Sequence, residues 1–424
     1  MRAKTSIFLA LFTVIAVFPL QAEESLTWQQ CVSESRQAHP DLSSALALVR
    51  QAEADKRITA GSMLPQLDLG ASILRSGTTD NGIAASSVFS YSLLAEQLLY
   101  DGHKTSNQVA SNEEAIKAAK YNYSAVSANV RYLLRSAFTQ LLLAQDLVAL
   151  TVEIAERRQK NVRLINLYYQ GGKEHIGSLH QAQADLAQAE FEVSQAERGL
   201  ALAQTKLASA LGRDIHTPLR VQGAYRAGDL TAGKPDFSLL AKNNPLVQQF
   251  DTKTMAARYA LDVAKSAFSP QLYLTSSVGR SSPDRWPFNA LDWRAGLTLS
   301  VPIYEGGSGR ERVSKAKAVL SQLDAQKKSG YLQIFDTLEQ NWKNFQDARR
   351  MVIVQKKQLD AAIDRSAIAN AQYSNGLVTF NEWVIIENNL VGAKKNFLNA
   401  EANLLIAEAQ WIQVKGGGLD DQQE

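Results

Sequence analysis

The stretch LTLSVPIYEGGSGRERVSKAKAV (297–319) decides the fold. Up to Ile303, apolar residues alternate with small or polar ones, which is typical of a β-strand with one apolar face. Tyr304 is followed by an acid and two glycines, and then by a basic stretch with helical character. Glycine allows a sharp change of backbone direction, so the stretch predicts a strand that passes directly into a helix.

A near copy of this stretch, YSLLAEQLLYDGHKTSNQVASNE (91–113), lies 204 residues earlier. The same offset relates Tyr169 to Tyr373, and an offset of 205 relates Pro65 to Pro270. Offsets that hold over so much of the chain predict two tandem copies of one structural unit. We place the copies at 23–212 and 241–416, with a linker at 213–240 and a C-terminal tail at 417–424.

Each copy contains two predicted strands, at about 65–75 and 87–100 in the first copy and about 270–280 and 292–304 in the second. Their length suits a tilted strand that crosses a bilayer. A half-buried strand of a soluble sheet alternates in the same way, so alternation alone does not decide between the two. The polar loops between the strands and the aromatic residues near the strand ends favour the membrane.

Two long helices follow the strands of each copy, at about 104–170 and 175–211 in the first and about 308–374 and 378–415 in the second. No glycine occurs from 103 to 170, and no proline from 303 to the end. At about 1.5 Å per residue the first of these helices would be on the order of 100 Å long. Such rods predict an elongated molecule.

The second helix of each copy carries a heptad pattern. Apolar residues recur every seven positions, with a second series three residues further on, and the pattern holds over five heptads. The series run from Leu179 to Leu207 and from Ala182 to Ala210, and from Trp383 to Trp411 and from Ile386 to Val414. A sustained a/d pattern of this kind predicts coiled-coil packing between the long helices.

The first 22 residues have the features of a secretory signal peptide. Arg2 and Lys4 precede an apolar run, and Leu20-Gln21-Ala22 offers a cleavage site after Ala22. An uncleaved N-terminal anchor is the alternative, but an apolar run of about 12 residues is short for a membrane span. The sequence therefore predicts an exported protein. Its formal net charge of +3 gives no reason to expect a nucleic-acid partner.

Nothing in the sequence predicts an enzyme, a cofactor or a metal site. The single cysteine, Cys31, lies near the N-terminus, where a cysteine nucleophile is not expected. The histidines lack the spacing of a helical zinc site; they are His39, His103, His175, His180 and His216.

Four strands cannot close a barrel, and lipid does not tolerate the unpaired edges of an open sheet. If the strands span a membrane, several chains must therefore share one barrel. A soluble periplasmic coiled-coil adaptor or scaffold protein is the alternative, because it would also be exported and heptad-patterned. Such a protein would not need paired amphipathic strands between its helices.

The doubled order of elements resembles the TolC-like outer-membrane channels of Gram-negative bacteria. The residues that carry the resemblance are LPQLDL and SPQLYL, LLYDG and PIYEGG, and the helix breaks YYQGGKEHIGSL (168–179) and QYSNGLVTFNEW (372–383). It implies an α+β membrane protein in the bacterial outer membrane. In that fold, a homotrimer shares a 12-stranded β-barrel, with four strands per chain, and continues it as a long periplasmic α-helical coiled-coil barrel.

The same resemblance implies the function and the partners. The chain would be the exit duct of a tripartite efflux pump or a type I secretion system. It would sit in outer-membrane lipid and join a periplasmic adaptor and an inner-membrane transporter that supplies the energy. The linker at 213–240 would contribute to an equatorial region.

The helix breaks carry the site residues that the resemblance implies. The motif Gly376-Leu377-Val378-Thr379 matches the adaptor-docking motif of the family, whereas after Gly172 the first copy reads Lys173-Glu174-His175 and departs from it. Tyr373 and Glu382 match residues that narrow the channel and select ions. Val378 and Ile385 stand where a basic gate residue and a second acid are expected, so the resemblance implies a single ring of Glu382 carboxylates.

The strand-to-helix transitions form a second predicted site. They comprise Tyr100, Asp101 and Gly102 in the first copy and Tyr304, Glu305, Gly306 and Gly307 in the second. A tyrosine suits the membrane interface, an acid suits water, and glycine suits the turn. We expect these residues at the inner rim of the membrane.

Overall fold

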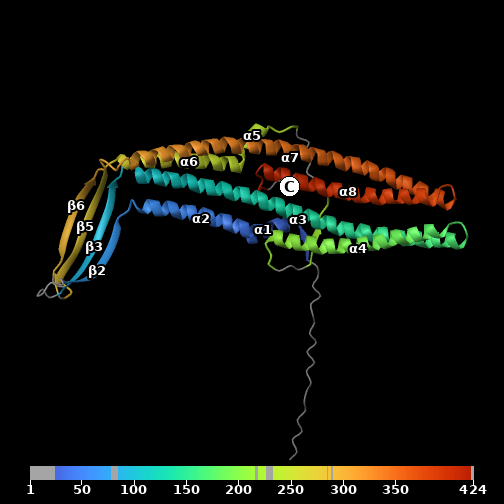
Figure 1. The fold of residues 1–424 in the computed structure, drawn as a ribbon, viewed down its shortest axis with the longest axis horizontal. Helices are drawn as coiled ribbons and strands as arrows, with labels where there is room; N and C mark the ends of the chain where they lie inside the picture. Colours follow the sequence, from blue (N-terminus) through green and yellow to red (C-terminus); the bar gives the residue numbers. More distant parts are fainter. Residues whose placement is uncertain are drawn as a thin grey trace, which may run out of the picture.

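The computed structural model describes residues 24–77, 85–214, 218–225, 233–283, 285–287 and 290–421. The predicted signal peptide at 1–22 and the last residues of the predicted tail lie outside the described residues. The molecule is a long helical body with a single β-sheet at one end, as Figure 1 shows. Both ends of the described chain lie near the middle of the body.

The sheet is built from both copies of the repeat. Its order is β2-β3-β5-β6, and all neighbours are antiparallel. The strands are β2 (Gln66–Ser76), β3 (Ser86–Tyr100), β5 (Gln271–Pro283) and β6 (Asp292–Ser300). Because β3 belongs to the first copy and β5 to the second, their pairing joins the two copies into one sheet. The outer strands β2 and β6 have no described neighbour on their outer edges.

The two outer strands are exposed on both faces. Every residue of β2 and β6 is exposed, including large apolar ones such as Leu69 at 80% and Trp293 at 77%. A soluble sheet buries its apolar face against another layer, and Figure 1 shows no helix lying over this one. The sheet therefore presents apolar surface to its surroundings.

One strand ends earlier than the sequence predicts. We expected the last strand to reach 304, but β6 stops at Ser300 and the residues up to Glu305 have no regular structure. Pro302 has no N–H to donate to a strand ladder, which explains why pairing ends before it. The preceding strand β5 runs to Pro283, slightly beyond its predicted end at 280.

Two helices run the length of the body, and four shorter ones pair with them in its two halves (Figure 1). The long helices are α3 (Lys104–Gln170) and α7 (Ser308–Ser374). In the half next to the sheet lie α2 (Pro40–Gly61) and α6 (Pro245–Lys265), and in the other half α4 (Ile176–Leu211) and α8 (Phe380–Val414). Helix α3 contacts α2, α4, α6 and α8, whereas α7 contacts α6 and α8.

The heptad pattern is reflected in the burial of α4. The alanines Ala182, Ala189, Ala196 and Ala203 are all buried in α4. Small side chains at these positions let α3 and α4 approach closely. Both ends of the other α4 series, Leu179 and Leu207, are buried too, while its middle members are half-buried.

The predicted linker at 213–240 contains regular structure. Strand β4 (Leu219–Gln222) pairs in parallel with β1 (Glu24–Thr27), and α5 (Phe237–Asn243) begins near the end of the linker. With α1 (Trp28–Ala38), the two strands pack against the middle of the helical body, where Leu134, Leu207 and Leu219 are fully buried, whereas α5 packs against α7 and α8.

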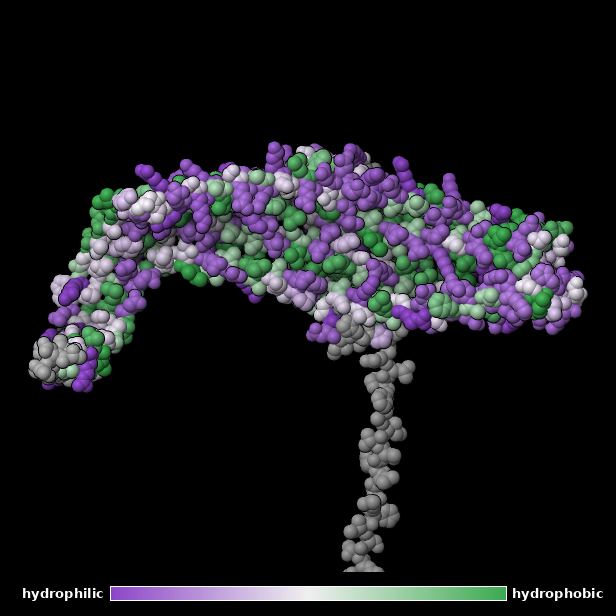
Figure 2. Space-filling view, in the orientation of Figure 1, coloured by the Kyte–Doolittle hydropathy of each residue, from purple (hydrophilic) through white to green (hydrophobic). Residues whose placement is uncertain are grey.

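Helix α3 includes a segment that is long and apolar enough to cross a membrane by length and composition alone. About 39% of that segment is buried inside the chain, where α3 packs against α1, α2, α4, α6 and α8. Figure 2 shows further hydrophobic residues in patches along the middle of the helical body and over the sheet.

Candidate functional site at the ends of the long helices

The two helix breaks lie side by side at the end of the body opposite the sheet (Figure 1). Helix α3 ends at Gln170 and α7 ends at Ser374, and each is followed by a turn with a glycine of positive φ. These glycines are Gly172, with φ +71°, and Gly376, with φ +72°. Only glycine adopts this conformation without strain, so it allows α4 and α8 to turn back along their partners.

An aromatic pair forms the centre of the second break. The ring of Tyr373 stacks on that of Trp383 with centroids 4.6 Å apart and planes within 6° of parallel. Both side chains are buried, together with Phe380 and with Ile165 from α3. The predicted gate residue Tyr373 therefore packs inside the chain, where it joins α7 to α8.

The hydroxyl of Tyr373 links the two copies. It donates a hydrogen bond of 2.9 Å to Oε1 of Glu174, which lies in the first break. Burial, together with the hydrogen bond and the charge of Glu174, raises the pKa of Tyr373 well above its usual value. The phenol thus stays protonated and remains a donor at physiological pH.

Glu174 is held in place by the start of α4. Its Oε2 accepts a 2.8 Å hydrogen bond from the hydroxyl of Ser178, which is buried. His175 caps the same helix, because its Nδ1 accepts from the Ser178 N–H at 3.3 Å. The residues that depart from the docking motif in the first copy therefore position the acid that binds Tyr373.

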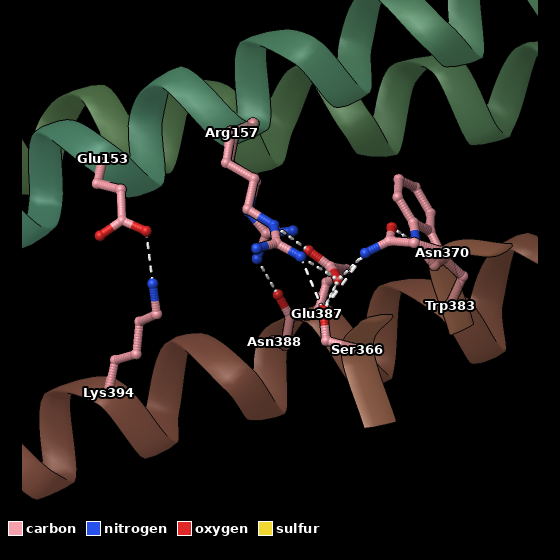
Figure 3. A network of polar contacts seen from close by, with 9 residues as sticks. Glu153, Arg157, Ser366, Asn370, Trp383, Glu387, Asn388 and Lys394 are labelled. Atoms are coloured by element: carbon pink, nitrogen blue, oxygen red, sulfur yellow. Dashed lines mark hydrogen bonds and ion pairs between the residues drawn. The ribbon is translucent and has the colours of Figure 1, made fainter. Parts of the chain in front are cut away.

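A polar network continues from the aromatic pair toward the middle of the body, as Figure 3 shows. The indole N–H of Trp383 donates to Oδ1 of Asn370 at 2.7 Å. The Asn370 amide donates to Oε1 of Glu387 at 3.3 Å, and the Ser366 hydroxyl donates to the same oxygen at 2.6 Å. Glu387 and Ser366 are each 2% exposed, so this carboxylate is nearly removed from water.

A guanidinium group from the first copy balances the charge of the buried Glu387 carboxylate. Arg157 of α3 binds Glu387 with two hydrogen bonds, of 2.6 and 2.8 Å, and also donates to Ser366 at 2.7 Å. Removing one partner of such a pair leaves a buried charge uncompensated, which costs about 3–5 kcal/mol. The pair therefore fixes α8 against α3.

Two further contacts join the same helices (Figure 3). Lys394 pairs with Glu153 at 2.5 Å, and Arg158 donates a hydrogen bond to Asn388. The Lys394 pair is partly exposed and contributes less than the buried one. Together with Arg157 and Glu387, these residues form an inter-repeat staple.

Glu382 has a local role in this structure. Its carboxylate accepts hydrogen bonds from the N–H and the hydroxyl of Thr379, both at 3.0 Å, and completes a capping box at the start of α8. These bonds, the backbone one first, lower the pKa of Glu382 below its usual range. The side chain is exposed and therefore charged at neutral pH.

The predicted docking motif projects from the end of the body. Leu377 is 72% exposed, and a Cβ added at Gly376 would meet no atom within 4 Å. Val378 instead packs against the core of the break, and Thr379 is the N-cap of α8, which begins two residues later than predicted. Gly172 in the first break is likewise exposed with open space around it.

The two predicted transitions lie where the sheet meets the helices, and they differ from one another. Asp101 is buried and accepts hydrogen bonds from the N–H and hydroxyl of Thr105 at 2.7 and 2.6 Å. Glu305 is exposed and pairs with Arg312 at 3.2 Å. Beside these acids, Tyr100 is 46% exposed and Tyr304 is 86% exposed.

The glycines of both transitions have positive φ. The values are +67° for Gly102, +64° for Gly306 and +88° for Gly307. A Cβ at Gly102 would lie 2.1 Å from Cβ of Ser269, so this position also lacks space for a side chain. The chain turns from strand to helix at these residues, as the sequence predicts.

Among the described residues no group of three or more His, Cys, Asp or Glu side chains could hold a metal ion. What the site offers is a set of contacts that hold two helical hairpins together at one end of a rod.

Comparison with known proteins assigns the fold to a family. The family model described as outer membrane efflux protein matches residues 31–213 and 237–417, one segment in each copy of the repeat. The chain belongs to the outer membrane efflux protein family. It is an efflux channel of the outer membrane with a large helical part on the periplasmic side.

Individual relatives are distant. The outer membrane efflux protein BepC of Brucella suis is 22% identical over 413 residues, which cover 92% of this chain and 88% of BepC. The fusaric acid resistance protein FusA of Burkholderia cepacia is 25% identical over 69% of this chain but only 57% of its own length. A solved structure of CusC matches with a TM-score of 0.83 and 21% identity, over 92% of this chain and 91% of that one. A protein of the same name in Escherichia coli is described as a cation efflux system protein.

Proposed function

We propose that three copies of the chain close into one continuous duct, with a 12-stranded barrel in the outer membrane and a helical tube below it. The observation that carries this proposal is the pair of unpaired sheet edges on β2 and β6. Helix α7 contacts α5, α6 and α8, and α2 contacts α3, so that α7 and α2 lie on opposite borders of the helical layer (Figure 1). Pairing β2 of one chain with β6 of the neighbouring chain would satisfy the backbone groups of both edges.

We infer that the duct is passive and works with two partners. A periplasmic adaptor would dock on it, and an inner-membrane transporter would supply the energy, as in a tripartite efflux pump or a type I secretion system. The relatives are named for different cargoes, fusaric acid for FusA and cations for CusC. Because these cargoes differ, we infer for this chain the passive duct and its two partners, and no particular cargo.

The latch at the ends of the long helices is proposed to hold the duct closed. The hydrogen bond from Tyr373 to Glu174 joins the two breaks, and the staple between Arg157 and Glu387 joins the same hairpins nearer the middle. Opening the tube requires the α7–α8 hairpin to move away from α3 and α4. Both contacts would have to break during that movement.

Glu382 is proposed to act as an ion filter. Its carboxylate is exposed and charged, and threefold symmetry would repeat it around the axis. A ring of acids favours cations. The capping box gives each carboxylate a fixed position at the start of α8.

Adaptor docking is proposed at Gly376, Leu377, Val378 and Thr379. Leu377 supplies an exposed apolar side chain, and the glycine before it leaves space for a close approach. Gly172 offers similar space in the first copy, but no leucine follows it. We therefore expect the second copy to dominate docking.

A cross-link between edge strands tests the closed duct. In a Cys31→Ser background, one cysteine is placed at Ala71 of β2 and a second is moved along β6 from Trp293 to Thr298. Oxidation of outer-membrane fractions should give a ladder that ends at three chains for at least one position. Cross-linking confined to dimers, or absent at every position, would refute the shared barrel.

A further inference from the structure

The level at which the sheet meets the helices is ringed by exposed apolar side chains. Ile303 is 94% exposed, Tyr304 86%, Leu64 63% and Phe268 52%. They come from the turn that follows α2, from the 3₁₀ turn η1 (Ser266–Phe268) and from the residues after β6. An exposed apolar ring on helical connections, rather than on the strands, requires an apolar or interfacial environment.

Contacts between these segments show that they lie together at the junction of the sheet and the helices. The side chain of Gln97, near the end of β3, donates to the carbonyl of Met63 at 2.6 Å. Ser266 of η1 donates to the carbonyl of Gly102 at 2.8 Å, and a Cβ at Gly309 would touch the ring of Phe268 at 2.9 Å. The turn before α3 and the start of α7 are thereby tied to the same ring.

Directly beyond the apolar ring, α7 presents positive charge. Between 304 and 317 there are four basic residues and two acidic ones. Arg312 pairs with Glu305, but Arg310, Lys315 and Lys317 are exposed and make no ion pair or side-chain hydrogen bond with any described residue. Surplus cations therefore face solvent at this end of the helix.

The spacing of these features fits the border of a bilayer. Arg310 lies in the first turn of α7, and Lys317 lies about 14 Å from the start of the helix, at about 1.5 Å per residue. The headgroup region of a leaflet is about 5–8 Å thick, and charge acts over a Debye length of about 8–10 Å. Long basic side chains can also reach back toward an interface. An apolar ring followed by cations is thus what a headgroup layer would contact.

We propose that this junction collar binds the headgroups of anionic phospholipids in the leaflet that faces the helices. The collar comprises Leu64, Phe268, Ile303, Tyr304, Arg310, Lys315 and Lys317. The inference rests on the proposed function, which places the sheet in the membrane. Charge complementarity and continuity with the exposed sheet favour lipid over a protein partner.

The test uses the full-length protein in detergent, titrated with phosphatidylglycerol or phosphatidylcholine while thermal unfolding is followed. The variant R310Q/K315Q/K317Q removes the free cations of the collar. The matched control K328Q/K343Q/K357Q removes three exposed lysines of the same helix that lie further from the sheet. Inorganic phosphate is titrated in parallel as a free anion.

We expect phosphatidylglycerol to stabilise the wild type at least tenfold more potently than phosphatidylcholine. The collar variant should lose that preference, while the control stays within twofold of the wild type. Equal potency of the two lipids, or an unchanged preference in the collar variant, would overturn the proposal. So would equal stabilisation by inorganic phosphate, which would identify a free-anion site.

Two further readings separate this proposal from the proposed function. If the collar variant fails to assemble as the wild type does, the collar is a contact between neighbouring chains and the lipid proposal is wrong. If the wild type itself is absent from the outer-membrane fraction, the proposed duct fails as well. A wild type that assembles in the membrane but shows no lipid preference refutes the collar alone.

Discussion

The ring of Tyr373 lies flat against that of Trp383, 4.6 Å away, while its hydroxyl reaches Glu174 of the other copy. One residue thus combines apolar stacking within its own hairpin with a polar contact to the neighbouring hairpin. The indole N–H of Trp383 extends the connection to Asn370 and onward to the Glu387 carboxylate. A change at either ring should therefore affect how the two hairpins fit together.

Replacing Trp383 by alanine should loosen the end of the body. The side chain is buried, so its loss should cost about 3–5 kcal/mol in the free energy of unfolding. Limited proteolysis should cut the variant at the breaks 171–175 and 375–379 faster than the wild type. Trp383→Phe keeps a stacking ring and loses only the hydrogen bond to Asn370, so its effect should be clearly smaller; equal cleavage of all three proteins would contradict the packing role.

Replacing Tyr373 by phenylalanine removes the hydroxyl and leaves the stack. Losing the bond to Glu174 should weaken the latch by about 1–2 kcal/mol. The reconstituted channel should then spend a larger fraction of time in its conducting state in single-channel recordings. Tyr169→Phe is the matched control, because Tyr169 lies at the same end and is partly exposed. If both variants behave alike, the hydroxyl of Tyr373 does not hold the latch.

The Arg157–Glu387 pair should show strong coupling in a double-mutant cycle. Either Arg157→Met or Glu387→Met leaves one buried or partly buried charge without its partner, with an expected loss of about 3–5 kcal/mol. The double variant should recover part of that loss, because no unpaired charge remains. Chemical denaturation in detergent measures all four proteins, and additive losses would exclude the staple.

The pH dependence of ion selectivity should follow Glu382. Its pKa is lowered in the folded chain, so its charge is fully present above the ordinary glutamate pKa and is lost only as pH falls through the lower folded value. Cation preference in a bilayer should persist to correspondingly low pH. Thr379→Ala removes one donor and should shift the loss of preference to higher pH.

Glu382→Ala supplies the control for that titration. It should weaken cation preference at neutral pH and leave assembly intact. Unchanged ion selectivity in Glu382→Ala would remove the proposed filter and leave Glu382 with its capping role alone.

The repeated order of strands and helices could be predicted because it depends on patterns local in sequence. The heptads of α4 and α8, and the glycines at 102, 172, 306 and 376, each act within a few residues. The end of β6 could also have been foreseen from Pro302, which cannot donate to a ladder. The predicted end at 304 was based only on the alternation of apolar and polar residues, which continues past Pro302.

The contacts between copies could not be predicted in the same way. Arg157 and Glu387 are 230 residues apart, and each alone looks like an ordinary charged residue of a helix surface. The pairing of β1 with β4 likewise joins two very short strands across most of one copy. The sequence signal for these contacts was the departure of Glu174 and His175 from the docking motif, since Glu174 accepts a hydrogen bond from Tyr373 and His175 caps α4.

The native mass of the protein extracted with detergent from outer-membrane fractions tests the central claim most directly. A chain with four strands and two free edges cannot close its own sheet, so the account predicts a stable particle of three chains. A monomer or dimer in the membrane extract, or a protein found only in the soluble fraction, would contradict it.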